Sequence, residues 1–563
     1  MAQITPIKYC PERDPVVNPQ HWYFLPAAKA LKICTRCYHD RLSATPFARQ
    51  FQVEYYPSGD SRYCDFNNPR MHSVLQQAVA QNNFQLLHDH IVYRSQIPRC
   101  KGEEIVKPDD GFEWFKPLNP ALKDKFAACR ACYEDYLIPA GFAPQLSAPI
   151  RQEKELNYMC DMGFRFCLRL ATTCRDWNQM ISYAVHRAGL PKCTGLTPAE
   201  ASSGKWYKLR PNDLDSLLFC EACYYDFASM TIMEPHVYLP QQQPQPNTQI
   251  NCAVSGWPSM RSAWEQALNK KDFNTFYAAA QVFVRNPPCL HTGITKGTWY
   301  TLKPPCDEVD ICASCYAGIF VVNDVGHFLA QKWTQPGQTR LCNMNLHQPR
   351  AMQLYQKLDA AITANDEKMF SDFARWAAET PLCPGGALVN DRMWYRHETF
   401  SCCPSCWMEV IDGTPLESAF PVRNQLYKPQ LKCDFYSARV RGLWMEACQK
   451  NDLPGFVAFM DNRLKIWSQT YPLIQQHLAT MRMNMMRQQT LFMSSTILNG
   501  GNSIAAAAGV SGNYGNSQVG YGWETYAGAE GAMQFNQAMS MNGANGSVAM
   551  SIAQLEGLWK SVE

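Results

Sequence analysis

The sequence predicts a mainly α-helical protein with small zinc-knuckle modules, made of five tandem repeats of about 92 residues that stack as an elongated array. Two observations predict this fold class. A C-x-x-C pair recurs five times at a nearly constant interval, and a helical pattern of apolar residues follows each pair. We therefore expect each repeat to combine one four-cysteine zinc module with one helical hairpin.

The composition is that of a globular protein, and its most informative feature is the number of cysteines. The chain has 563 residues, 46% of them hydrophobic, and a formal charge of +3. So small a charge does not favour a protein that binds nucleic acid by neutralising phosphates. No apolar run reaches the roughly 18 residues of a membrane span and the start lacks a signal-peptide core, so we expect an intracellular protein, cytoplasmic or nuclear. In a reducing compartment, 25 cysteines indicate metal binding or catalysis.

The C-x-x-C pairs define the repeat. The steps between their first members are 95, 91, 92 and 91 residues. An aromatic residue follows each pair, and a Trp-aromatic pair precedes it. We expect the Trp-aromatic pairs to form the apolar core of the knuckle, with base stacking as the alternative. The C-x-x-C pairs are Cys34/Cys37, Cys129/Cys132, Cys220/Cys223, Cys312/Cys315 and Cys403/Cys406, and the Trp-aromatic pairs begin at Trp22, Trp114, Trp206, Trp299 and Trp394.

One isolated cysteine upstream and one downstream of each pair complete a quartet. The downstream cysteine follows the pair by 27 to 29 residues although the intervening sequence varies, which indicates a loop with both ends tied to one point. Grouping each pair with the next repeat's upstream cysteine instead would strand Cys10 and leave the last group one ligand short. The predicted metal ligands are Cys10, Cys34, Cys37 and Cys64; Cys100, Cys129, Cys132 and Cys160; Cys193, Cys220, Cys223 and Cys252; Cys289, Cys312, Cys315 and Cys342; and Cys383, Cys403, Cys406 and Cys433.

Four thiolates satisfy the tetrahedral preference of Zn²⁺, so we expect about five structural zinc ions per chain. The alternatives are disulfides, iron–sulfur clusters or another metal. A thioredoxin-like redox pair does not fit five copies in step, and catalytic zinc does not fit because no histidine recurs at a fixed offset. The knuckle, as in CYHDRL and CYEDYL, resembles treble-clef and related four-cysteine zinc modules in site geometry, a resemblance that implies no particular function.

Five cysteines lie outside the quartets. We expect Cys167, Cys174 and Cys448 to be small core residues on helical stripes. Cys402 adjoins Cys403 and is an alternative ligand, although only Cys403 keeps the C-x-x-C spacing. The sequence pattern assigns Cys306 neither to a metal site nor to a helical stripe.

A helical pattern interrupted by a polar turn follows each quartet. In the third repeat Met260, Trp264 and Leu268 share one face, and the stripe resumes at Phe273 after the turn. The predicted boundaries are residues 1–98, 99–191, 192–287, 288–381 and 382–470 for the repeats, 471–498 for a Met-rich helix, 499–546 for a disordered Gly/Ala/Asn/Ser segment, and 547–563 for an amphipathic helix.

The sequence favours a non-enzymatic zinc-repeat scaffold for protein–protein interaction or assembly. The C-terminal stripe of Val548, Ile552, Leu555, Trp559 and Val562 predicts either docking, including self-association, or folding back on the preceding helices. The alternative function is a nucleic-acid or ribonucleoprotein factor with several zinc knuckles. No nucleophile with its base and no phosphate loop in context is visible, so we predict no catalytic residues.

Overall fold

The computed structural model describes residues 4–17, 19–56, 61–335, 337–508, 513–515 and 522–563. About half of the chain is helical, and the strands form small sheets. The chain divides into two compact units, Met1–Glu379 with the first four quartets and Thr380–Glu563 with the fifth. Over the described part of the chain, no helix combines the length and apolar character required to span a membrane.

Each repeat contains a three-stranded antiparallel sheet whose middle strand carries the Trp-aromatic pair. The sheets are, in strand order, β2 (Ile33–Cys34), β1 (Gln20–Phe24) and β3 (Gln52–Tyr56); β5 (Ala128–Cys129), β4 (Glu113–Phe115) and β6 (Ile150–Arg151); β10 (Val237–Tyr238), β8 (Trp206–Leu209) and β9 (Phe219–Cys220); β13 (Ile311–Cys312), β12 (Trp299–Leu302) and β14 (Leu329–Lys332); and β16 (Ser401–Cys402), β15 (Arg392–Arg396) and β17 (Val422–Tyr427). Two further pairs are β11 (Gln249–Ile250) with β7 (Ala199–Glu200), and β18 (Asn513–Gly515) with β19 (Gly522–Glu524).

The knuckle of each repeat is a helical turn that runs into a short π-helical segment. These knuckle helices are α1 (Thr35–Cys37) with η2 (Tyr38–Leu42), α4 (Arg130–Cys132) with η5 (Tyr133–Leu137), α7 (Glu221–Cys223) with η10 (Tyr224–Ala228), α10 (Ala313–Cys315) with η12 (Tyr316–Val321), and α13 (Pro404–Cys406) with η14 (Trp407–Ile411).

A helical hairpin follows each quartet, and several of its helices begin at side-chain caps. In the first repeat Asn68 accepts a hydrogen bond from the amide of Met71, and Asn83 caps the second helix. The hairpins are α2 (Pro69–Ala80) with α3 (Phe84–Ser95), α5 (Arg165–Thr173) with α6 (Trp177–Ala188), α8 (Pro258–Lys270) with α9 (Phe273–Arg285), α11 (Ala351–Ala364) with α12 (Lys368–Glu379), and α14 (Ala438–Lys450) with the start of α15 (Leu453–Ala507).

Within the first unit, the hairpins of the first three repeats each contact the knuckle helix of the following repeat. Arg94 at the end of α3 forms a bidentate ion pair of 2.9 Å with Asp135 of η5, and both side chains are buried. Arg187 of α6 also forms a buried ion pair with Asp226 of η10, but its Nε and Nη2 both donate to the same carboxylate oxygen, Oδ2. Each arginine stands ten residues after the first residue of its helix, and each aspartate three residues after the second knuckle cysteine.

The third boundary in the first unit replaces this ion pair with an apolar contact. Phe283 of α9 stands at the arginine position, and Gly318 of η12 stands at the aspartate position. A Cβ on Gly318 would lie 2.5 Å from the carbonyl oxygen of Ser259 and 2.8 Å from the Phe283 ring, so no larger residue fits there. At this boundary both positions of the contact, the arginine position and the aspartate position, therefore hold a different residue from the first two boundaries.

One contact does not fit the predicted elongated array. Lys8 in the first repeat pairs with Asp324 in the fourth at 3.1 Å, and Lys270 of the third repeat pairs with the same carboxylate. The four repeats of the first unit thus bring their first and last members together. The arrangement of all five repeats stays a prediction.

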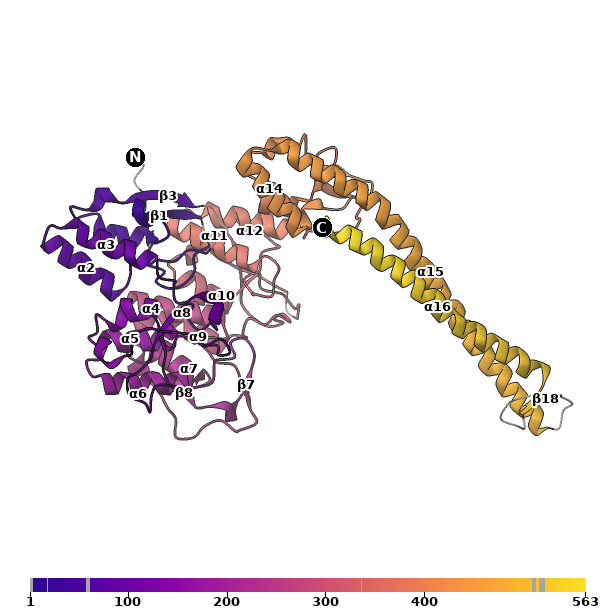
Figure 1. The fold of residues 1–563 in the computed structure, drawn as a ribbon, viewed down its shortest axis with the longest axis horizontal. Coiled ribbons are helices and arrows are strands. Elements are labelled where there is room, and N and C mark those ends of the chain that lie inside the picture. Colours follow the sequence, from indigo (N-terminus) through magenta and orange to yellow (C-terminus); the bar gives the residue numbers. More distant parts are fainter. Residues whose placement is uncertain (1–3, 18, 57–60, 336, 509–512, 516–521) are drawn as a thin grey trace. The chain divides into compact units, whose positions relative to one another are not determined.

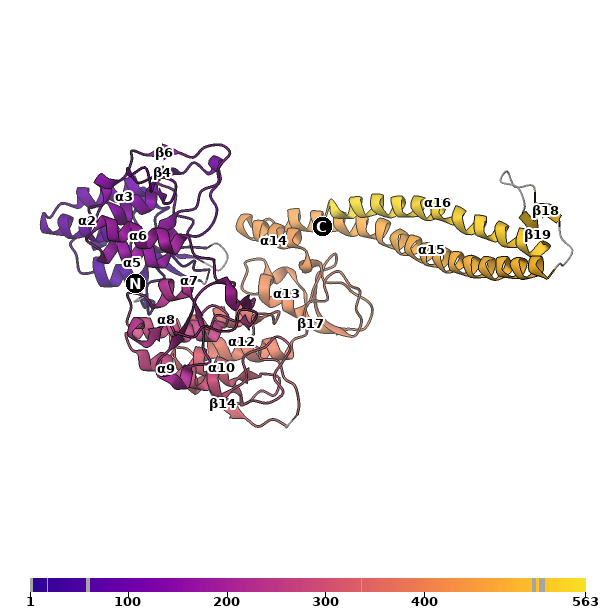
Figure 2. The same cartoon turned by 90° about the horizontal axis from the view of Figure 1, so that it is seen from below.

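The second unit contains a long antiparallel helical hairpin in which α15, of 55 residues, lies beside α16 (Tyr526–Lys560) (Figures 1 and 2). This corrects the prediction that residues 499–546 are disordered, because α15 extends to Ala507 and α16 starts at Tyr526. Residues 509–512 and 516–521 of that segment lie outside the described residues.

Small side chains explain the helical pairing of this segment. Core positions alternate in steps of three and four along both helices, as in a coiled coil, from Trp467 to Asn502 and from Gly531 to Trp559. Gly531 and Ala538 let the helices approach closely: a Cβ on Gly531 would lie 2.8 Å from the Asn499 side chain. The Ser495 hydroxyl donates to the Gly531 carbonyl at 2.8 Å. The composition that suggested disorder is therefore that of a closely packed helix interface.

The C-terminal stripe folds back on the chain, one of the two predicted outcomes. Ile552 and Val562 are buried, and Trp559 lies over the guanidinium of Arg463 at 4.7 Å. Arg463 donates to Asp434 and to Glu563, each at 2.6 Å. Arg463 stands ten residues after the start of its helix, like Arg94 and Arg187, so Glu563 provides the carboxylate that a following repeat provides elsewhere.

Candidate metal centres

The structure brings the twenty predicted ligand cysteines together in five groups of four, with the predicted membership. Within each group all Sγ atoms lie within 4.8 Å of one another. Four sulfurs at about 2.3 Å from one zinc ion are separated by roughly 3.8 Å, so each group is compatible with a tetrahedral site. All 25 cysteines are free thiols. Binding of zinc at these groups stays a prediction.

The sheet and the knuckle helix fix two sulfurs of each group. Cys34 ends β2, where it is the cross-strand partner of Trp22, and Cys37 ends α1 one turn later. The same register pairs Trp114 with Cys129, Trp206 with Cys220, and Trp299 with Cys312. In the first four repeats the tryptophan is therefore buried beside the first knuckle cysteine. In the fifth repeat the register pairs the neighbouring residues, Tyr395 with Cys402. The downstream cysteine returns to the site after the third strand.

The second aromatic residue of each Trp-aromatic pair stacks on the aromatic residue that follows the knuckle. The ring centroids are 3.6 to 4.1 Å apart and the planes nearly parallel in Tyr23–Tyr38, Phe115–Tyr133, Tyr207–Tyr224, Tyr300–Tyr316 and Tyr395–Trp407. These stacks tie the middle strand to the knuckle helix. All five tryptophans are buried, as expected for a core role, and are closed to base stacking.

Backbone amides surround the sulfurs. The amide of Cys37 donates to Cys34 Sγ at 3.3 Å, and the amides of Cys129 and Cys312 donate to the downstream sulfurs Cys160 and Cys342. Hydrogen bonds of this kind orient metal ligands and stabilise thiolates.

Two half-buried arginines approach the sulfurs in the same way from unrelated segments. Arg13 donates to Cys132 Sγ at 3.2 Å and to the carbonyl of Met162 at 3.1 Å. Arg441 donates to Cys406 Sγ at 3.2 Å and to the carbonyl of Phe435 at 2.7 Å. Both carbonyls lie two residues after the downstream cysteine. We call this arrangement the guanidinium bridge.

The guanidinium bridge places a cation beside the sulfurs, which favours their thiolate form. Burial alone would lower the pKa of Arg13, but Cys132, Tyr136 and Cys100 raise it well above its ordinary value. A half-buried arginine is stabilised by such partners. The sequence pattern did not identify Arg13 or Arg441, because they come from different positions in their repeats.

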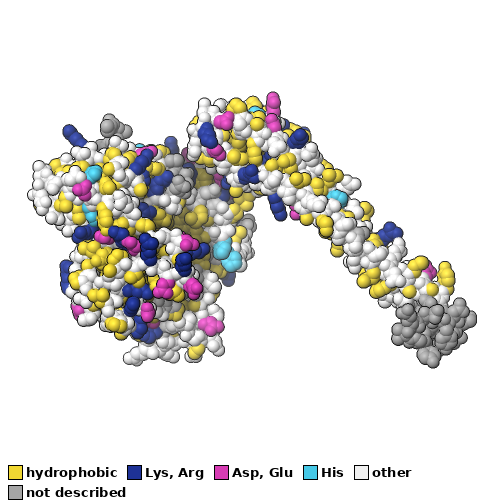
Figure 3. All heavy atoms as spheres, viewed as in Figure 1, with side chains coloured by type: hydrophobic (Ala, Val, Ile, Leu, Met, Phe, Trp, Pro, Cys, Tyr) yellow, Lys and Arg dark blue, Asp and Glu magenta, His cyan; other side chains and the backbone are white. Residues whose placement is uncertain are grey.

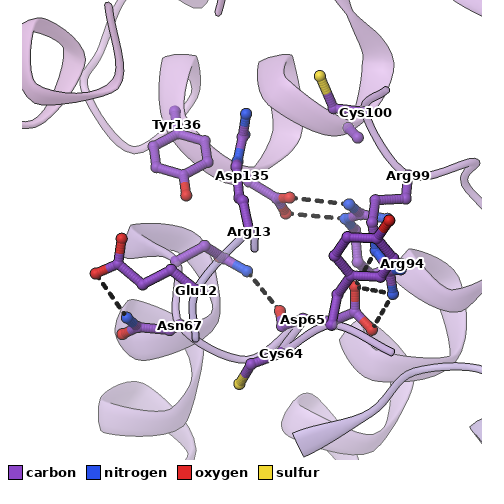
Figure 4. A pocket seen from close by; sticks show the side chains of 13 residues that line it. Glu12, Arg13, Cys64, Asp65, Asn67, Arg94, Arg99, Cys100, Asp135 and Tyr136 are labelled. Carbon is purple, nitrogen blue, oxygen red and sulfur yellow. Dashed lines mark hydrogen bonds and ion pairs between the residues drawn. The ribbon is translucent and has the colours of Figure 1, made fainter. Parts of the chain in front are cut away.

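Charged residues connect the first and second groups (Figure 4). Arg99, next to Cys100, binds Asp65, next to Cys64, and Arg94 binds Asp135, three residues after Cys132. They line a cavity of about 40 Å³, which has room for water molecules only. The residue after the downstream cysteine is Asp, Asp, Asn and Asp in repeats one, two, four and five, and its side chain accepts a backbone amide before the knuckle. That regularity was visible in the sequence.

The thiols of one group differ in acidity. Hydrogen bonds with the other three cysteines lower the pKa of Cys289 and raise that of Cys315, and burial raises the pKa of Cys342. Hydrogen bonding likewise lowers the pKa of the upstream cysteines Cys100, Cys193 and Cys383. Without a cation, the buried thiols with raised pKa retain their protons at neutral pH, so metal binding must release protons.

The structure shows where the five cysteines outside the quartets lie. Cys167 and Cys174 are buried, and Cys448 is half-buried. Cys402 is buried on β16 and lies outside the quartet, which contains Cys403. Cys306 is buried in the core of the fourth repeat, where its amide donates to Thr301 at 3.2 Å.

The fold and the five groups define a class of protein: a chain that is about half helical, with small sheets and four-cysteine groups compatible with structural zinc. Comparison with protein families, with curated proteins and with solved structures found no match.

Proposed function

We propose that each four-cysteine group holds one structural Zn²⁺ ion and that the protein is a non-enzymatic scaffold for protein–protein interaction or assembly. The observation that carries the proposal is the set of five closed four-cysteine groups. Four thiolates fill a tetrahedral zinc site and leave no coordination position for a substrate, which supports a structural role.

The exposed face of α15 supports assembly. Met483, Met486, Met493, Ile497 and Ile504 are each more than 60% exposed, at steps of three, seven, four and seven residues. Figure 3 shows hydrophobic side chains along the surface of the long helical hairpin. This spacing is that of a coiled-coil seam. Because the C-terminal stripe is used inside the chain, we assign self-association to this face of α15.

Sedimentation analysis over a range of protein concentrations tests this assignment. We expect a concentration-dependent increase in mass for the wild-type chain and its loss in Met493→Glu/Ile497→Glu. The matched control is Met550→Glu, an exposed residue on α16 that should leave association unchanged. A wild-type chain that stays monomeric up to millimolar concentration would contradict self-association through α15.

The second candidate is a nucleic-acid or ribonucleoprotein factor. The formal charge of +3 gives it little support, and each filled site adds about two negative charges. A salt-titrated binding assay with RNA and DNA distinguishes the two functions. The scaffold proposal predicts weak binding, whereas tight binding that falls steeply with salt would favour the alternative.

A further inference from the structure

The guanidinium bridge has an open counterpart in the fourth repeat. Its two acceptors in the second and fifth repeats are the sulfur of the second knuckle cysteine and the carbonyl two residues after the downstream cysteine. The corresponding residues of the fourth repeat are Cys315 and Met344. Both line a cavity of about 240 Å³, which we call the repeat-4 cleft.

The repeat-4 cleft lies between the third and fourth repeats and has largely apolar walls. Leu196, Trp257, Leu290 and Leu346 line it, and His291 and His347 add polar ring atoms. At about 30 Å³ per water molecule, the cleft holds about eight waters, more space than one guanidinium group requires. Among the described residues that line it there is no Lys, Arg, Asp or Glu.

The residue that fills the equivalent space in the second repeat is absent here. Arg13 stands three residues after Cys10, and the residue three positions after Cys193 is Leu196, which is 47% exposed. The Tyr355 hydroxyl donates to the Met344 carbonyl at 3.1 Å, and a carbonyl oxygen has a second lone pair for another donor.

We propose that the repeat-4 cleft binds an arginine side chain of a partner protein, with its guanidinium group between the Cys315 sulfur and the Met344 carbonyl. The inference rests on the proposed occupation of the fourth four-cysteine group by zinc, because four thiolates around Zn²⁺ give the wall of the cleft a charge of about −2. Apolar residues beside the arginine would pack against Leu196 and Trp257.

Arginine suits this cleft better than lysine. Its planar fork reaches two acceptors at once, as Arg13 and Arg441 do, and it is less strongly hydrated than an ammonium group. Because no Lys or Arg lines the cleft, the cluster charge is available to the incoming group.

A peptide titration of the full-length zinc-loaded protein tests the proposal. The probes are Ac-Leu-Arg-Leu-amide and the same peptide with citrulline, which keeps the shape and removes the charge. We expect the arginine peptide to bind at millimolar concentration or tighter, and at least tenfold more tightly than the citrulline peptide. Leu196→Arg should place an internal guanidinium in the cleft and weaken peptide binding at least tenfold. The matched control is Leu239→Arg, at an exposed leucine that does not line the cleft, which should stay within about twofold of wild type.

Zinc content, measured on every sample, separates this inference from the proposed function. If a chain with five zinc ions binds both peptides equally, binds neither, or is unaffected by Leu196→Arg, the proposed arginine binding by the repeat-4 cleft is wrong, whereas the proposed function stands. A chain without zinc would overturn the proposed function and the inference together.

Discussion

The first test at the scale of single residues compares two buried cysteines of the second repeat. Cys129 belongs to a four-cysteine group, whereas Cys174 ends α5 outside any group. Cys129→Ser should remove one zinc ion and unfold the repeat, because the binding energy of structural zinc is also folding energy. Cys174→Ser should cost about 1–2 kcal/mol, as an ordinary core change does. Thermal unfolding with metal analysis measures both, and equal, mild effects would show that the groups do not bind metal.

Arg13 provides a second test, because it touches a ligand without being one. Arg13→Ala should weaken zinc binding at the second site by about 10- to 100-fold, the usual effect of losing a hydrogen bond to a metal ligand. The control is Arg49→Ala, an exposed arginine of the first repeat. Competition with a calibrated chelator measures the change, and identical zinc affinities in the two variants would count against the guanidinium bridge.

The pH dependence of zinc binding follows from the raised thiol pKa values. Thiols such as Cys315 and Cys342 hold protons in the metal-free state and lose them when zinc binds. Binding therefore releases protons, and the apparent affinity should rise with pH and fall on acidification. With two to three protons released, it should change by about 100- to 1,000-fold per pH unit. A chelator competition at pH 6, 7 and 8 that gives a constant affinity would contradict this.

At the scale of elements, the C-terminal segment acts as the cap of the fifth repeat. Glu563→Gln should destabilise the second unit by about 1–3 kcal/mol, because Arg463 is buried and loses a charged partner. Glu556→Gln, on an exposed face of α16, is the control. Truncation after Asn545 should lower the melting temperature further. An unchanged melting temperature in the truncated chain would show that the segment does not stabilise the fold.

The elements also show what the sequence could and could not predict. The helical hairpins and the four-cysteine groups were predictable, because a periodic stripe and a repeated ligand spacing are local signals. The pairing of α15 with α16 was not predictable, because a segment rich in glycine and alanine has too little apolar content to fold when it is considered alone. The small residues stabilise the pairing by letting the two helices approach closely, and this becomes visible only once Asn499 and Ser495 lie opposite Gly531. Arg13 escaped prediction for the same reason: its partner Cys132 is 119 positions away.

At the scale of the whole molecule, we expect each repeat to depend on its neighbours. A fragment of residues 100–190 would leave Asp135 and Arg187 without their partners Arg94 and Asp226. Removing one partner of a buried pair is strongly destabilising, by about 3–5 kcal/mol. The fragment should therefore melt well below the full chain even when loaded with zinc. A fragment that is monomeric and as stable as the whole chain would contradict the dependence.

Native mass spectrometry of the purified protein measures directly whether the chain holds five structural zinc ions. We expect a mass increment of about five zinc ions, with loss of the folded charge-state distribution when a chelator removes them. Two or fewer zinc ions, with the quartet cysteines found oxidised, would contradict this expectation.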